Sequence, residues 1–131
     1  MKFTLEQING LKSESKGGKD FPMLIQNFKN IGVNRFITYV ETGYTEYFDD
    51  ENNSIKSDAL YDAKNISEAV NEENFEKQLR LHQQGGTDFY TFCQDCADNG
   101  IDHWIVDLNK MTCTYRTSEN QEILIEQVPS M

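Results

Sequence analysis

The strongest constraint on the fold is an internal repeat, because the sequence resembles itself when it is shifted by 68 positions. The segment that starts at Gly17 then aligns without a gap with the segment that starts at Gly85. Eleven of the 39 aligned positions are identical, which is more than chance usually gives in an ungapped window. The identical pairs are Gly17/Gly85, Gly18/Gly86, Asp20/Asp88, Phe21/Phe89, Gln26/Gln94, Gly32/Gly100, Ile37/Ile105, Tyr47/Tyr115, Glu51/Glu119, Asn52/Asn120 and Ile55/Ile123. The repeat predicts two copies of one structural unit.

Each copy is predicted to form two helices followed by an antiparallel β-meander. Apolar residues at helical spacing precede Gly32 in the first copy and Gly100 in the second, and a period of two follows each glycine. The pattern near Ile55 gives no clear third strand in the first copy. The expected strands are 36–40 and 44–48 in the first copy, and 104–108, 112–116 and 122–128 in the second.

These elements predict an α+β fold, made of two pseudo-repeats of a helix-helix-antiparallel meander with the helices packed on an antiparallel sheet. A length of 131 residues fits a single domain over 1–131. The pseudo-repeats are expected at about 1–58 and 67–129, and the linker between them at about 56–66.

The starts of the helices carry recognisable capping signals. Thr4 and Gln7 have the spacing of a capping box, and Asn71 is expected to begin the helix that precedes the second glycine pair. Asp20 and Asp88 stand where the dipole of the following helix favours an anion.

The charge balance limits the classes of partner. With 22 acidic and 12 basic residues the formal net charge is −10, and binding to nucleic acid or an anionic membrane requires clustered Lys and Arg. No nucleic acid and no membrane is therefore expected as a partner. No apolar run approaches the roughly 18 to 20 residues of a membrane helix, and the chain begins without an apolar signal region. Three cysteines cannot all pair within the chain, so the cytoplasm is the expected location.

Cys93 and Cys96 form a CxxC pair, and the repeat bears on what the pair does. Shifting back by 68 positions places Ile25 at the position of Cys93 and Phe28 at the position of Cys96. A buried free cysteine packs like a small apolar residue, so we favour a packing role over a redox pair or a metal site. A structural zinc ion would need two further ligands at a suitable spacing, so no metal and no cofactor is expected. Cys113 aligns with Thr45, which is typical of a filler position on a strand.

Two small groups of polar residues are the remaining candidate sites. His103 and Asp107 share one face of a predicted strand and are close enough to interact if Ile105 leaves room. Tyr115, Arg116 and Glu126 are a candidate polar cluster between neighbouring strands, with Arg116 suited to hold a carboxylate. A half-exposed sheet surface and an ordinary cross-strand ion pair explain the same residues equally well. The acidic segment 49–54 lacks the glycine and the closing carboxylate of a calcium loop.

The segment from His82 to Pro129 resembles the second half of the YbcV-like family, domain of unknown function 1398, whose members are often labelled phage envelope protein. The first half is similar through Phe21 to Phe36, so the resemblance covers most of the chain. After Tyr115 the chain departs from the family pattern, because Arg116 follows without an intervening glycine. The resemblance implies a small bacterial or prophage-associated protein without an established activity. The residues that carry it are Gln83 or Gln84, Gly85, Phe89 or Tyr90, Phe92, Cys93, Gly100, Trp104, Tyr115, Arg116, Glu126 and Pro129.

Two hypotheses about function follow. The favoured one is a non-enzymatic interaction protein, a monomer or homodimer, that binds a protein partner through its acidic surface or through a groove lined by Tyr39, Asp107 and Tyr115. A variant of it is an acidic mimic of nucleic acid, with its carboxylates in two rows. The alternative is a small enzyme or thiol sensor that uses Cys93 with Cys96, or His103 with Asp107.

Overall fold

The computed structural model describes residues 2–14 and 21–128. It confirms the α+β class, with two successive helix-helix-strand units. The elements are α1 (Leu5–Glu14), α2 (Phe21–Asn30), β1 (Arg35–Tyr39), β2 (Thr45–Phe48), β3 (Ser54–Lys56), α3 (Glu72–Gln83), α4 (Phe89–Asp98), β4 (His103–Asp107), β5 (Thr112–Arg116) and β6 (Glu122–Gln127).

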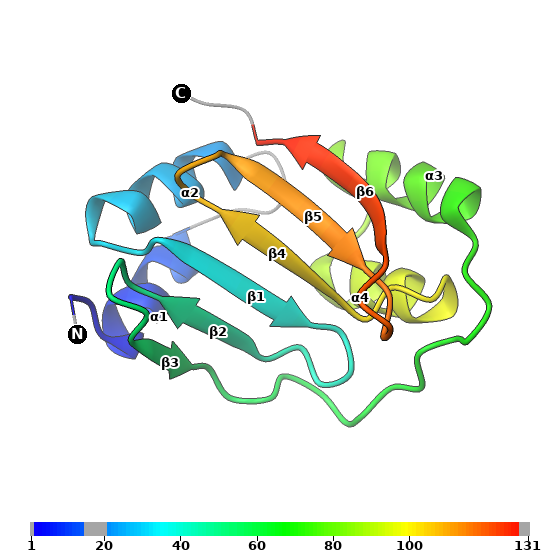
Figure 1. Cartoon of the computed structure of the whole chain (residues 1–131), viewed down its shortest axis with the longest axis horizontal. Coiled ribbons are helices and arrows are strands. Elements are labelled where there is room, and N and C mark those ends of the chain that lie inside the picture. Colours follow the sequence, from blue (N-terminus) through cyan, green and yellow to red (C-terminus); the bar gives the residue numbers. More distant parts are fainter. Residues whose placement is uncertain (1, 15–20, 129–131) are drawn as a thin grey trace.

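All six strands form one antiparallel sheet in the order β3-β2-β1-β4-β5-β6. The helices lie behind this sheet, α1 and α2 behind one half and α3 and α4 behind the other, so the molecule has two layers (Figure 1). The β1–β4 pair joins the two repeats at the centre of the sheet. The face of the sheet toward the viewer carries no helix, and we call it the open face.

The register between β1 and β4 gives the sheet a pseudo-twofold axis. Ile37 pairs with Ile105, and these two residues are equivalent in the repeat. The β1–β2 and β4–β5 ladders also match pair for pair under the shift of 68 positions. The repeat read from the sequence is therefore also a repeat of backbone geometry.

The turns repeat the same backbone conformations. Gly32 and Gly100 both have positive φ, where a side chain would be strained, and they end α2 and α4 as the sequence predicts. Asn52 and Asn120 are equivalent residues, and each has a φ of 65°. Asparagine tolerates this left-handed conformation better than most residues do. The β2–β3 and β5–β6 connections are therefore two copies of one turn.

Two different residues stabilise this turn from equivalent positions. The carboxylate of Asp49 accepts hydrogen bonds from the backbone N–H groups of Glu51 and Asn53, at 2.9 and 3.0 Å. The hydroxyl of Thr117 accepts from the backbone of Glu119 and Gln121, at 3.3 and 3.2 Å. The acidic segment 49–54 thus ends one strand and begins the next, with Asp49 bonded to its own turn.

The third strands differ between the repeats. In the first copy, β3 has only three residues with an exposed-intermediate-exposed pattern, so the sequence offers little apolar signal for it. In the second copy, a register shift lies opposite Tyr115 and Arg116, where Arg116 pairs with Glu122 but Tyr115 pairs with Leu124. Ile123 is the extra residue of this bulge, and it reverses the alternation of side chains along the rest of β6.

The expected helix starts agree with the described residues. The backbone N–H of Thr4 donates to Gln7 Oε1, and the backbone N–H of Gln7 donates to Thr4 Oγ1, which completes a capping box. Asn71 caps α3, and Asp88 caps α4 by accepting from the Thr91 N–H at 2.7 Å. Gly17, Gly18 and Asp20 lie outside the described residues.

The connection between the repeats is longer than the predicted linker of 56–66, because Lys56 belongs to β3 and α3 begins at Glu72. Residues 57–71 run along one margin of the molecule (Figure 1). Their backbone N–H groups bond to the β1–β2 turn at Glu41 and Thr42 and to the end of α4 at Ala97 and Asn99. No helix within 2–14 and 21–128 is long and apolar enough to cross a membrane.

Candidate functional site

Alternation along the strands sends one set of side chains into the core and the other set onto the open face. On β1, Phe36 and Thr38 are buried against the helices, and the three residues around them are half-exposed. The open-face residues form rows that run across neighbouring strands, as the ladder pairs define them. We call one of them the polar row: Tyr44, Tyr39, His103, Arg116 and Glu122.

Aromatic stacking organises the first part of the polar row. The rings of Tyr39 and Tyr44 stack with centroids 4.6 Å apart and planes 16° apart. On the other side of Tyr39, the His103 ring lies 5.8 Å away. The ammonium of Lys56 lies 5.9 Å from the Tyr44 ring centroid. The rings of His103 on β4, Tyr39 on β1 and Tyr44 just before β2 thus form one continuous wall on the open face.

His103 makes a contact that differs from the predicted one. Its Nδ1 lies 2.7 Å from Oδ2 of Asp102, and its side chain is only 11% exposed. Asp107 stands at the other end of β4, where its Oδ1 accepts from the backbone N–H groups of Asn109 and Lys110. The predicted interaction of His103 with Asp107 is therefore wrong, because the two residues stand at opposite ends of β4 and each is bonded to other groups.

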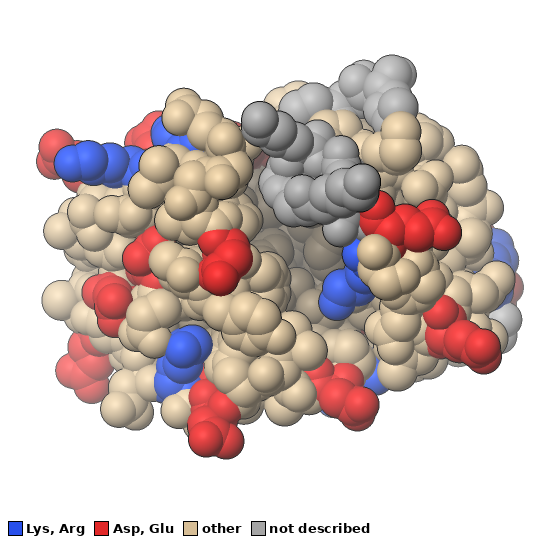
Figure 2. Space-filling model, turned by 180° about the vertical axis from the view of Figure 1, so that it is seen from behind, with Lys and Arg blue, Asp and Glu red and all other residues tan. Residues whose placement is uncertain are grey.

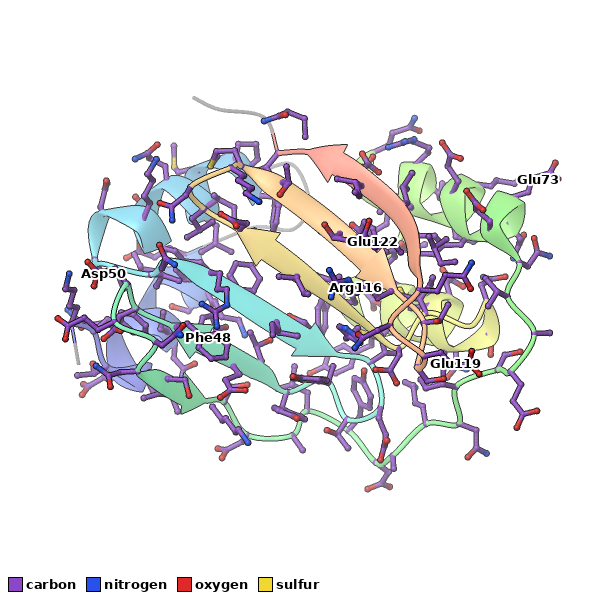
Figure 3. All side chains as sticks on the ribbon, in the orientation of Figure 1. Phe48, Asp50, Glu73, Arg116, Glu119 and Glu122 are labelled. Atoms are coloured by element: carbon purple, nitrogen blue, oxygen red, sulfur yellow. The ribbon has the colours of Figure 1, made fainter. Side chains whose placement is uncertain are left out.

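The predicted cluster of Tyr115, Arg116 and Glu126 is also not formed, because its members lie on both sides of the sheet. Tyr115 is 6% exposed and lies in the core, and its ring centroid is 5.0 Å from that of Phe75. Arg116 and Glu122 point toward one another over the open face, with Nη2 and Oε1 3.3 Å apart (Figure 3). Glu126 pairs with Cys113 on the helix side of the sheet.

Glu126 takes part in an ion pair with a helix. Its carboxylate lies 2.8 Å from Nη1 of Arg80 on α3, and the Gln83 amide also donates to it. This pair ties the edge strand β6 to the helix layer. Of the six predicted site residues, the structure therefore brings Tyr39, His103 and Arg116 together and places Asp107, Tyr115 and Glu126 elsewhere.

The pseudo-twofold axis relates the polar row to a second row with different chemistry. Phe48 occupies the position equivalent to Arg116, and the two lie on opposite halves of the open face (Figure 3). The Arg35 guanidinium lies 4.0 Å from the Phe48 ring centroid, and its Nη1 donates to Asn52 Oδ1 at 2.8 Å. The duplicated face has therefore diverged in its side chains while its backbone has not.

A row with three isoleucines lies between these two rows, and Glu46 and Lys56 continue it across β2 and β3. Ile37, Ile105, Thr114 and Ile125 follow one another across β1, β4, β5 and β6. Ile37 and Ile105 are half-exposed, and Ile125 is 55% exposed. We call these four residues the central row. Side chains of this kind at the middle of an uncovered sheet are typical of a surface that meets another molecule.

The open face does not share the acidic excess of the chain. Its strand residues include three acidic side chains and three basic ones, so their formal charges cancel, although the whole chain has 22 acidic and 12 basic residues. The excess negative charge lies on helices and connections. The charged residues of the open-face strands are Arg35, Glu46, Lys56, Asp107, Arg116 and Glu122.

A pocket of about 270 Å³ opens where β1 ends, beside the polar row. Its lining is Tyr39, Glu41, Thr42, Tyr44 and Asp102. Burial raises the pKa of Tyr39 above its usual value, and the neighbouring Tyr44, Glu46 and Asp102 raise it further. Tyr39 therefore presents a neutral hydroxyl in a negative environment. Sequence reasoning did not single out Tyr44, although it belongs to the expected strand 44–48, and it missed Asp102 because that residue precedes β4.

The thiols lie in the core, which confirms the packing interpretation. Cys93 and Cys96 are both 0% exposed, as Ile25 is in the other repeat, and Cys113 is buried as well. Burial raises the pKa of Cys93 to about 11 and that of Cys113 to about 12, and it raises the pKa of Cys96 well above its usual value. These thiols are protonated at neutral pH and are poor nucleophiles.

The structure gives no metal site among the described residues, and the helix side shows no rows of carboxylates. Over residues 2–14 and 21–128, no group of three His, Cys, Asp or Glu side chains is placed to hold a metal ion. On the helix side, acidic side chains form separate patches with basic side chains among them (Figure 2). This face therefore gives no support to a nucleic-acid mimic.

Comparison with known proteins identifies a family without assigning an activity. No curated protein matches the sequence. Residues 10–127, which are most of the chain, match the family described as "Protein of unknown function (DUF1398)". The shared sheet with its open face and the helices α2, α3 and α4 fall within this matched region, which begins inside α1. The chain therefore belongs to the DUF1398 family.

Proposed function

We propose that this chain is a non-enzymatic binding protein that docks a protein partner on the open face of its sheet. The observation that carries the proposal is the uncovered sheet with the central row at its middle. The resemblance to the YbcV-like proteins labelled phage envelope protein supports a bacterial or prophage origin, and the three free cysteines support a cytoplasmic location.

The carboxylates beside the open face and the net charge of the whole chain favour a basic partner. Protein interfaces have an apolar centre and a polar rim, and complementary charge at the rim speeds association. Here the centre is the central row, and carboxylates such as Glu41 and Asp102 stand at the rim. A chain with a net charge of −10 attracts a partner of opposite charge. The expected partner has an apolar patch bordered by Lys and Arg.

The alternative of a thiol enzyme or sensor has less support. Cys93 and Cys96 are inaccessible and have raised pKa values, whereas a reactive cysteine is partly exposed with a lowered pKa. His103 is bonded to Asp102, and Asp107 is bonded to the backbone of the following turn. An enzyme that uses His103 together with Asp107 therefore has no support from the positions of these side chains.

Site-specific photo-crosslinking in a lysate of the native host tests the proposal. A benzophenone amino acid replaces Thr114 at the centre of the open face in one variant and Met23 on α2, which is 53% exposed, in the control. A basic protein is expected to crosslink at position 114 and not at position 23.

The captured protein is then purified, and its Kd is measured by calorimetry. Ile125→Asp is expected to weaken binding at least about tenfold, because a carboxylate would enter the apolar centre of the interface. Met23→Asp, which adds the same charge on the helix side, should leave the Kd unchanged. Equal crosslinking at both positions, or equal Kd values for both variants, would refute the proposal.

A further inference from the structure

The pocket at the end of β1 has a pseudo-twofold counterpart at the end of β4. The shift of 68 positions relates Glu41 of the pocket to Asn109 of the counterpart. It also relates Asp102 of the pocket to Asn34 of the counterpart. The counterpart lies at the opposite end of the central strand pair, between the end of β4 and the start of β1 (Figure 1). The same sheet thus carries two versions of one local structure.

Backbone hydrogen bonds show that the two ends are built alike. The N–H of Val40 donates to the carbonyl of Asp102 at 2.9 Å, and the N–H of the equivalent Leu108 donates to the carbonyl of Asn34 at 3.0 Å. The difference between the two ends is therefore a difference of side chains.

The side chains at the counterpart are joined by a hydrogen bond, whereas those at the pocket are not joined to each other. Asn109 Nδ2 donates to Asn34 Oδ1 at 2.6 Å, so an amide donor bridges the counterpart. In the pocket, both positions carry carboxylates, which only accept hydrogen bonds. Asp102 Oδ2 is bonded to His103, and among the described residues no donor reaches Asp102 Oδ1 or the Glu41 carboxylate. The bridging donor of the counterpart is missing here.

We propose that the pocket binds a cationic N–H donor, an alkylammonium or guanidinium group, that bridges Glu41 and Asp102. Such a group supplies the donor that Asn109 supplies in the counterpart, and its single positive charge offsets one of the two negative charges of the carboxylates. The stacked Tyr39 and Tyr44 form a rigid wall beside it, and about 270 Å³ accommodates the end of a Lys or Arg side chain. This inference rests on the proposed function, because it makes the pocket the anchor for a basic side chain of the docked partner.

Titration of the full chain, followed by two-dimensional amide NMR, tests the site directly. The probes are n-butylammonium and ethylguanidinium chloride at low salt and neutral pH, with sodium chloride as the reference. Saturable shifts are expected at residues 39–44 and 102–103, with a Kd on the order of millimolar because the probes are small. Linear shifts spread over many surface carboxylates would overturn the proposal.

Substitutions identify the groups responsible. Glu41→Gln and Asp102→Asn should each weaken the probe about tenfold, because each removes one charge-assisted hydrogen bond. Glu41→Asn with Asp102→Asn copies the counterpart and should abolish binding. Glu119→Gln, an exposed change in the β5–β6 turn, is the control and should bind normally. Equal Kd values for Glu41→Gln and the wild-type chain would also overturn the site.

The same variants separate this site from the proposed function and distinguish two sources of the cation. Ile125→Asp should weaken partner binding at least about tenfold and leave probe binding intact, so either proposal can fail alone. If Asp102→Asn weakens both the probe and the purified partner, the cation is a side chain of the partner. If it weakens only the probe, the pocket holds a free alkylammonium or guanidinium compound, and the link to the partner is refuted.

Discussion

Replacing Gly43 by alanine tests how the segment between the repeats is held to the sheet. Gly43 lies in the β1–β2 turn with a φ of 75°, and a Cβ atom there would be 2.6 Å from Cε2 of Tyr61. The Tyr61 hydroxyl donates to the carbonyl of Val40, and the Lys64 ammonium lies 4.6 Å from its ring centroid. The ring therefore cannot move without losing contacts.

The expected loss of stability is the sum of two effects. A side chain at positive φ costs about 1–2 kcal/mol. The equivalent residue Met111 has a φ of 54°, so this backbone accepts a side chain, and the lower figure applies. Displacing Tyr61 removes one hydrogen bond and part of its packing, which adds about 1–2 kcal/mol. Gly43→Ala should therefore lower the free energy of unfolding by about 2–3 kcal/mol.

Urea unfolding of a double-mutant cycle separates the two effects. In a Tyr61→Ala background the clash is absent, and Gly43→Ala should cost only about 1 kcal/mol. The difference between the two backgrounds measures the contact of Tyr61 with the turn. An equal cost in both backgrounds would refute the reasoning, because the whole effect would then belong to the backbone.

Three further measurements test the packing and the turns. The pKa values of Cys93 and Cys113 in the folded chain, about 11 and about 12, exceed the value of 9.0 that is usual for an exposed thiol. The unfolded chain therefore loses these protons first, and the free energy of unfolding should fall as the pH rises from about 9 to 11. Urea midpoints across this range check it, and a flat profile would contradict it. Cys96→Ser should destabilise the fold by about 1–3 kcal/mol, because it buries a hydroxyl without a hydrogen-bond partner. Cys96→Val buries no polar group and should destabilise the fold by less, and thermal melts of the two variants can show the difference. Thr117→Val should cost about 1–3 kcal/mol, because two turn N–H groups lose their acceptor. Thr117→Asp places the residue of the equivalent position, Asp49, in the β5–β6 turn, and the turn should keep its conformation. Hydrogen exchange of the Glu119 and Gln121 amides can test this, because both should stay protected.

Much of the fold could be predicted because the repeat doubled the signal. Gly32 and Gly100 marked the same helix end twice, and Ile25 and Phe28 identified the slots that Cys93 and Cys96 fill. The pairing of β1 with β4 was not predictable, because the identity of Ile37 and Ile105 does not reveal that they face each other.

The site was less predictable because it depends on features that alternation does not encode. Glu122 and Glu126 are four residues apart and would share a face in a regular strand, but the bulge at Ile123 sends Glu126 to Arg80. Asp102 precedes its strand, so counting positions along β4 did not include it. The three-residue β3 forms through its pairing with β2 and not through its own composition.

The pairing of Ile37 with Ile105 also has a consequence for the origin of the molecule. Two separate chains, each with one helix-helix-meander unit, would make the same central ladder if each contributed the same isoleucine at a true symmetry axis. Joining such chains end to end requires only a connection as long as residues 57–71. The present sheet has the architecture of a homodimer fused into one polypeptide, which freed each half to acquire different side chains.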